Sequence, residues 1–331
     1  MRSATAAAIA VLTVVVAIGG GLAIARITRP PAPTPVRVSV TAPPTAVPSP
    51  TAVDEAALFR QPLSSGCATT QSVWVVTNGG GLLRYDGSAW SQVDDTLRSL
   101  TSVACAPTRA YAVGLVGALL LIDDAARQIR ATDVTIEDLF GVAPLGDGAL
   151  MVGSRGAVFI LAGGDIQPYA SGIDEDLHDL VAFSQTSAWA VGDAGITYRL
   201  DQRGWNPVGS GQAATLRAIA ATTPANAVAV GDGGVVVAYA SGWHTVKSGV
   251  NARLRDVIVE PALWIVGDGG TLLHGSLDDL RPIDLHTSCD LVSVFARGPR
   301  AEVWVVGVKG GAGGVWRLAT DGTVTTHWGG C

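Results

Sequence analysis

Three cationic or titratable side chains and three aspartates recur at matching positions of a repeated segment. His178, Arg217 and Arg255 each follow a leucine at the start of an apolar run. Later in the same three repeats an aspartate follows a glycine, at Asp193, Asp232 and Asp268. Arginine presents its donors as a planar fork that matches a carboxylate, so the set could recognise an anion or an acidic peptide. Alternatively, the six residues form an ion-pair network in which each aspartate bonds the backbone of its turn.

The other reactive side chains form no recognisable catalytic or metal-binding pattern. The acidic segments lack the alternating spacing of a calcium loop; they contain Asp94, Asp95, Asp133, Glu137, Asp138, Asp174, Glu175 and Asp176. No histidine accompanies a serine or cysteine in a nucleophile motif. The glycine-rich segment 310–314 opens no predicted helix, so it is not a phosphate loop. We therefore expect no catalytic residue, no metal and no cofactor.

A repeated β-structure would position the six candidate residues. The motif seen in residues 188–195 as Ala-Trp-Ala-Val-Gly-Asp-Ala-Gly occurs seven times with variations, at steps of 36 to 40 residues. A fixed period of this length indicates stacked supersecondary units. Each period contains short β-branched or aromatic runs separated by turns of Gly, Asp and Pro. Four short antiparallel strands per period are typical of a propeller blade, so we predict an all-β, seven-bladed β-propeller.

The predicted ring gathers the candidate residues on one face. In a propeller, the turns between second and third strands share a face with the crossings between blades. His178, Arg217 and Arg255 would enter from these crossings near the mouth of the central channel, and the three aspartates would lie in the turns. The blades are expected near residues 60–95, 96–133, 134–173, 174–212, 213–252, 253–289 and 290–331. The periodic tryptophans are expected to pack between blades.

The N-terminal residues are predicted to direct the chain to a membrane. Residues 1–28 contain an apolar run from about Ala4 to Ala25, which as a helix would span a bilayer core. This length favours an uncleaved signal anchor, and a signal peptide cleaved after Ala25 is the alternative. Residues 29–58 are rich in Pro and Thr and should form an extended linker to a propeller over residues 59–331. The expected location is the cell membrane, single-pass with an extracytoplasmic propeller, or secreted after cleavage.

Four cysteines flank the point where the ring would close. We predict disulfides Cys67–Cys105 and Cys289–Cys331, because each pair occupies matching points of adjacent blades. Four cysteines allow three connectivities, and Cys67–Cys331, which would join the chain ends, is the main competitor. The first and last blades are each predicted to contain all four of their own strands, so something other than a shared strand should hold the ring shut.

The charge distribution excludes one class of partner. All 28 acidic residues and 18 of the 22 basic residues follow Arg37, leaving a net charge of −10 on the chain beyond that residue. A strongly acidic domain repels the phosphate backbone, so we expect no nucleic-acid partner.

The repeat Leu-x-x-Ile/Val…Ala-Trp-Ala-Val-Gly-Asp-x-Gly…Gly-Trp resembles bacterial-neuraminidase-type repeat propellers. It is nearest to those like the photosystem II stability and assembly factors, among WD40/YVTN-like rings. The resemblance implies a non-enzymatic, chaperone-like scaffold outside a membrane whose arginines contribute to partner binding; Arg217 and Arg255 match in type and strand position. The sialidase Asp-box is absent, and residues 85–90 are its nearest remnant. We expect a monomeric, membrane-tethered scaffold that binds a protein or peptide; a carbohydrate-binding or glycoside-hydrolase propeller is the alternative.

Overall fold

The computed structural model describes residues 11–18, 21–28, 38–39, 43–46, 54–95, 98–125, 127–298 and 302–331. The chain forms two compact units, residues 1–36 and residues 37–331. The second unit contains the candidate site. It includes a short helix, α1 (Glu55–Leu58), whose first turn is capped by the carboxylate of Asp54.

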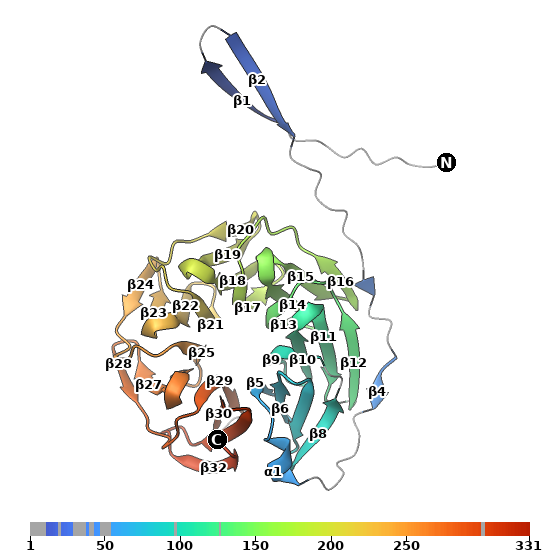
Figure 1. Cartoon of the computed structure of the whole chain (residues 1–331), viewed down its shortest axis with the longest axis vertical. Coiled ribbons are helices and arrows are strands. Elements are labelled where there is room, and N and C mark those ends of the chain that lie inside the picture. The colour runs from blue at the N-terminus through green and yellow to red at the C-terminus, as the bar shows by residue number, and fades with distance from the viewer. Residues whose placement is uncertain are drawn as a thin grey trace. The chain divides into compact units, whose positions relative to one another are not determined.

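The second unit is a ring of blades around a central channel (Figure 1). Its described residues form seven sheets, each with four consecutive antiparallel strands, as the repeat predicts. The blades are, in order, β5 (Leu63–Ala68), β6 (Val73–Thr77), β7 (Gly81–Tyr85) and β8 (Trp90–Asp95); β9 (Leu100–Cys105), β10 (Arg109–Gly114), β11 (Ala118–Asp123) and β12 (Gln128–Asp133); β13 (Leu139–Leu145), β14 (Gly148–Gly153), β15 (Val158–Ala162) and β16 (Asp165–Pro168); β17 (Leu177–Ser184), β18 (Ser187–Gly192), β19 (Thr197–Asp201) and β20 (Gly204–Pro207); β21 (Leu216–Thr223), β22 (Asn226–Gly231), β23 (Val236–Tyr239) and β24 (Trp243–Val246); β25 (Leu254–Ile258), β26 (Leu263–Gly267), β27 (Leu272–Ser276) and β28 (Asp279–Pro282); and β29 (Asp290–Arg297), β30 (Glu302–Lys309), β31 (Ala312–Leu318) and β32 (Val324–Gly329).

The second strand of each blade forms the core. In β6 and β26 every residue is buried, because each blade packs both of its faces against its neighbours. The tryptophans of these second strands are fully buried, at Trp74, Trp189, Trp264 and Trp304. A strand covered on both faces needs continuous apolar residues, which explains the runs of Val, Ala and Trp.

A short 3₁₀ turn joins the second and third strands and holds the repeated aspartate. In the fifth blade this turn is Asp232–Gly234, and both glycines have positive φ. A Cβ atom on Gly234 would lie 1.9 Å from the carbonyl oxygen of Val250, so only glycine fits there. The amide of Asp232 donates to the carbonyl of Thr215 at 3.0 Å. The turn therefore places the aspartate beside the start of the first strand of its own blade.

Two segments of the predicted linker add fifth strands to the outer edges of two blades. β3 (Val38–Ser39) pairs with β16, and β4 (Thr45–Ala46) pairs with β12, both antiparallel. The outermost strand of a blade presents unpaired backbone groups. The linker satisfies some of these groups in the second and third blades.

The ring closes between the seventh and first blades, a boundary that we call the seam. As expected, neither blade lends a strand to the other among the residues that the structure describes. Phe59 and Tyr85 pack with Trp304 in one apolar cluster, and the Trp304 and Trp328 rings stack at 5.4 Å. The amide of Gly66 donates to Oγ of Ser293 at 3.3 Å across the seam. Aromatic packing and hydrogen bonds therefore close the ring.

Both predicted disulfides are present. The Cα atoms of Cys67 and Cys105 lie 5.6 Å apart, and those of Cys289 and Cys331 lie 6.0 Å apart. Their expected role in closing the ring needs correction, because neither bond crosses the seam. The first joins the inner strands of blades one and two, and the second joins Cys289, the residue before β29, to Cys331, two residues after the end of β32. Each disulfide instead reinforces structure on one side of the seam.

The first unit differs from the helix expected over residues 1–28. β1 (Val11–Ile18) and β2 (Gly21–Thr28) pair antiparallel, with Val11 opposite Thr28. β1 consists largely of Val, Ile and Thr, whose branched side chains favour strands. Among the described residues, no helix has the length and apolar character needed to cross a bilayer. The signal anchor, the cleaved alternative and the domain boundaries stay predictions.

Candidate functional site

The innermost strands of the blades line a central channel of about 750 Å³. Each innermost strand has a leucine at or near its start, and the residue that follows this leucine lies at the wall of the channel. In chain order these residues are Ser64, Thr101, Phe140, His178, Arg217, Arg255 and Val292. The cationic or titratable ones therefore occupy blades four to six, as the sequence predicts. We call the cluster of His178, Arg217, Arg255, Asp193, Asp232 and Asp268 the arc.

Each cation of the arc pairs with the turn aspartate of its own blade. Nε2 of His178 lies 2.7 Å from Oδ1 of Asp193. Arg217 makes a two-pronged contact with Asp232, at 3.0 Å from Nε and 2.8 Å from Nη2. Nε of Arg255 donates to Asp268. The structure thus brings each of the three cationic or titratable residues that the sequence singled out together with the aspartate of its own blade, as two arginine–aspartate ion pairs and one histidine–aspartate hydrogen bond.

The partners perturb the ionisation of the aspartates. The hydrogen bond from His178 holds the pKa of Asp193 below its ordinary value, and the hydrogen bonds from Arg217 do the same for Asp232. A lowered carboxyl pKa means that the charged pair is favoured over the protonated acid. At neutral pH these aspartates are ionised.

The guanidinium groups of the arc are half-buried and keep donors to spare. The side chains of Arg217 and Arg255 are each 30% exposed. An arginine carries five N–H donors, and within the described part of the chain Arg217 donates from Nε and Nη2 to Asp232. Pairing with aspartate thus fixes the direction of each guanidinium without consuming its hydrogen-bonding capacity. An anion at the channel mouth would meet preoriented donors.

Two further residues belong to the arc that sequence reasoning missed. Nε of Arg253 lies 3.1 Å from Oδ1 of Asp232, so two arginines share that carboxylate. Nη2 of Arg255 lies 3.8 Å from Oδ2 of Asp290. Arg253 lies in the crossing before β25 and Asp290 is the first residue of β29, positions at which the repeat imposes no residue type. The only sequence signal was the close spacing of Arg253 and Arg255.

Two carboxylates inside the channel were also missed. Oδ2 of Asp179 accepts the amide of Ile219 at 2.9 Å, and Oδ2 of Asp256 accepts the amide of Val294 at 2.8 Å. Each bond joins the inner strands of two neighbouring blades. Burial raises the pKa of Asp179 to about 7, with a smaller contribution from the charge of Asp256. Burial also raises the pKa of Asp256 to about 6.

Acidic residues of the crossings bond turn amides of the preceding blade. Oδ1 of Asp138 accepts the amide of Val116 at 2.8 Å, and Oδ1 of Asp176 accepts the amide of Arg155 at 2.8 Å. These carboxylates therefore tie blade to blade. Within the ranges that the structure describes, no group of three or more His, Cys, Asp and Glu side chains is placed to hold a metal ion.

Comparison with known proteins shows the fold. No family model matches the chain. The RRP9 WD40 repeats superpose with a TM-score of 0.62 at 9% identity, covering 74% of this chain and 87% of that one. YCF48 from Cyanidioschyzon merolae gives 0.63 at 15% identity, covering 85% and 99%. YCF48 bound to D1 peptide gives 0.63 at 14% identity, covering 88% and 98%.

One curated protein matches part of the sequence. The immune protein Tsi7 of Pseudomonas aeruginosa is 34% identical over 107 residues, which is 32% of this chain. The match spans 35% of the length of Tsi7. It is a local similarity and covers fewer than half of the blades.

Proposed function

We propose that the protein is a non-enzymatic, membrane-tethered scaffold whose arc binds a carboxylate-bearing segment of a protein or peptide. The half-buried guanidiniums of Arg217 and Arg255 carry this proposal, because they face the channel mouth with unused donors. Charge-assisted hydrogen bonds from a fork of N–H groups to a carboxylate are stronger than those between neutral groups. The structure of YCF48 bound to D1 peptide supports the proposal, since a ring of similar fold holds a peptide.

A double variant tests the arc. Arg217→Ala with Arg255→Ala should weaken binding of a fluorescein-labelled oligoglutamate peptide at least tenfold, measured by fluorescence anisotropy. The melting temperature should change little, because partly exposed ion pairs contribute only about 0–1 kcal/mol each. Oligoglutamine of the same length should bind neither protein.

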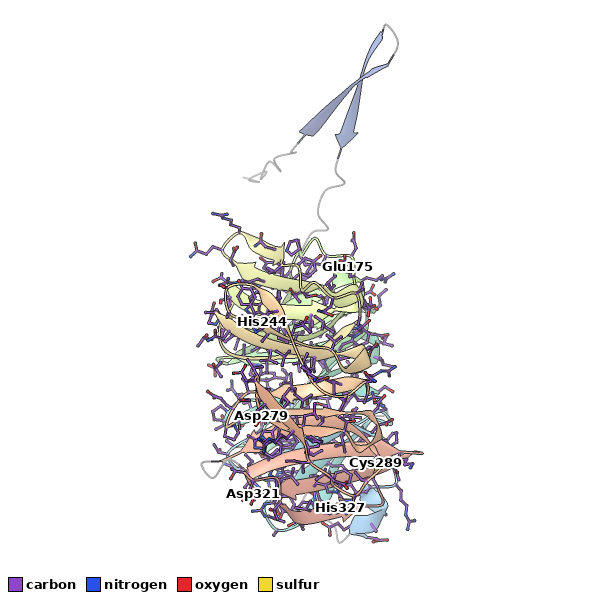
Figure 2. The ribbon with its side chains drawn as sticks, turned by 90° about the vertical axis from the view of Figure 1, so that its left-hand side faces the viewer. Glu175, His244, Asp279, Cys289, Asp321 and His327 are labelled. Carbon is purple, nitrogen blue, oxygen red and sulfur yellow. A yellow bond between two sulfur atoms is a disulfide. The ribbon has the colours of Figure 1, made fainter. Side chains whose placement is uncertain are left out.

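The matched control is Arg281→Ala. Arg281 pairs with Asp279 and is 76% exposed. Figure 2 places Asp279 on the face opposite Glu175 and Cys289, away from the crossings. Loss of Arg281 should leave peptide binding unchanged. A large drop in melting temperature with intact binding in the double variant would show that the arc is an internal ion-pair network only.

A further inference from the structure

A second surface lies on the face of the crossings, in the blade-two sector. Leu115, Val116 and Ile136 are 40%, 62% and 83% exposed. The turn that carries Leu115 and Val116 lies beside the crossing that carries Ile136, because hydrogen bonds join the two segments on both sides of Ile136. The amide of Val134 donates to the carbonyl of Gly117 at 2.8 Å, and the amide of Val116 donates to Asp138 at 2.8 Å. We call these three side chains the apolar patch.

The backbone at Val116 is in a conformation that disfavours its side chain. Val116 has φ 54° and ψ 39°, the left-handed region in which a β-branched residue is an outlier. The equivalent positions of blades five and six are Gly233 and Gly269, at φ 69° and 63°. The fold therefore accepts glycine here without strain. Val116 adds strain and exposed apolar surface, and its side chain adds nothing to the core.

The charges around the patch select the chemistry of what covers it. The described strand ends, turns and crossings near it carry six carboxylates and two arginines. Arg98 lies in the crossing before blade two and Arg155 in the 3₁₀ turn of blade three; the acids are Asp133 at the end of β12 and Glu137, Asp138, Asp174, Glu175 and Asp176 in the next two crossings. Arg98 pairs with Asp133 and Arg155 with Glu137, which leaves an acidic excess. An exposed apolar cluster with a charged rim is typical of a protein interaction site.

We propose that the apolar patch docks a cationic segment of a partner protein that carries large apolar side chains. The apolar side chains would cover Leu115, Val116 and Ile136, and lysine or arginine side chains would face the surrounding carboxylates. Complementary potentials of this kind set specificity and association rate. The inference does not depend on the arc, which lies on other blades and has the opposite preference for charge.

The test uses a short synthetic peptide that alternates lysine with leucine, labelled with fluorescein. The double variant Val116→Gly with Ile136→Ser should lose at least tenfold in affinity for this peptide. Val116→Gly relieves the backbone conformation, so its melting temperature should equal or exceed that of the unmodified protein. Peptides with serine in place of leucine, or glutamate in place of lysine, should bind at least tenfold more weakly.

Two controls separate this surface from others. Leu277 is also exposed, at 37%, but lies in another blade, so Leu277→Ser should leave peptide affinity unchanged. The Arg217→Ala, Arg255→Ala variant should bind the lysine–leucine peptide normally, whatever happens to its binding of oligoglutamate. Unchanged affinity in the patch variant, or equal binding of the serine peptide, would overturn the proposal. Patch-dependent binding to phosphatidylcholine vesicles in place of the peptide would overturn it too, in favour of a lipid surface.

Discussion

The two channel carboxylates show how a single residue can stabilise and destabilise the ring at once. Asp179 and Asp256 each accept an amide from the next blade, yet both sit where a negative charge is poorly solvated. Their pKa values, about 7 and about 6, lie above the ordinary value near 4. Between pH 4 and pH 7 the folded protein therefore binds more protons than the unfolded chain. Raising the pH through this window favours unfolding.

Removing either charge should stabilise the protein at high pH. Asp179→Asn is the cleaner test, because it keeps an oxygen that accepts the amide of Ile219; Asp256→Asn would lose one acceptor, since the second oxygen of Asp256 accepts the amide of Val257 at 2.8 Å. We expect the free energy of unfolding to rise by about 1–2 kcal/mol at pH 8 and to change little at pH 4.5, as measured by urea unfolding. Asp86 is the opposite case, because hydrogen bonds from Ser88 lower its pKa to about 2. Asp86→Asn should therefore lower the free energy of unfolding at pH 8. A change of the same sign in Asp86→Asn and Asp179→Asn would contradict this explanation.

Residue-scale prediction from sequence worked where the repeat constrains the backbone and failed elsewhere. Arg217 and Asp232 could be paired in advance, because both occupy fixed points of the period. Arg253 could not, since the crossing that contains it varies among blades. Asp179 was overlooked because a carboxylate after His178 looks like solvent-facing charge until the inner strand is known to face a narrow channel.

At the scale of elements, the 3₁₀ turn is the part on which the arc depends. Its second residue has positive φ in every such turn described, but the residue type varies from Val116 and Ala194 to Gly233. The third residue is Gly117, Gly156, Gly195, Gly234 or Gly270. The two positions therefore have different requirements: conformation alone at the second, conformation and space at the third.

Alanine substitutions at the two glycines of one turn should separate these requirements. Gly233→Ala meets nothing within 4 Å and should cost only about 1 kcal/mol, the penalty of the left-handed region. Gly234→Ala would bring its Cβ to 1.9 Å from the Val250 carbonyl oxygen. This change should cost about 3 kcal/mol or more, because the crossing must move. Chemical denaturation of both variants measures the loss in the free energy of unfolding, which should be larger for Gly234→Ala. Equal losses in the two variants would contradict the explanation.

Element types were predictable to different degrees. The blades followed from local signals, namely β-branched runs and glycine turns repeated seven times. The pairing of β3 and β4 with β16 and β12 did not, because it joins short segments to edges far away in the sequence. The segment that forms β1 and β2 was predicted as a helix from its apolar length, although its valine and isoleucine content equally suits strands.

At the scale of the whole molecule, the disulfide bonds lie at other places than the seam where the ring closes. The disulfides close loops of 38 and 42 residues on either side of the seam. Constraining loops of this length stabilises a fold by about 3–4 kcal/mol each, mainly through the unfolded chain. Neither bond links blade seven to blade one, so we expect the ring to stay closed without them.

A variant with all four cysteines changed to serine should be less stable but still closed. We expect a lower midpoint of thermal unfolding and an unchanged circular dichroism spectrum. The Gly66 amide, which bonds Ser293 across the seam, should keep its protection from hydrogen exchange at low temperature. Trp304→Ala should reduce that protection more, because it removes a fully buried ring from the seam cluster. Loss of Gly66 protection in the serine variant alone would restore a closing role to the disulfides.

The seam also orders the events of folding. Bonds between successive blades join residues about one repeat apart, such as Asp256 and Val294, whereas Gly66 and Ser293 are separated by 227 residues. Contacts between distant residues must overcome a larger loop-closure entropy and form slowly. Blades can therefore assemble on one another as a growing, curved stack, and the first and last meet only at the end. A ring that had not yet closed would expose Tyr85 and Trp304, which pack together in the closed ring, so we expect such an open form to aggregate more readily than the native protein.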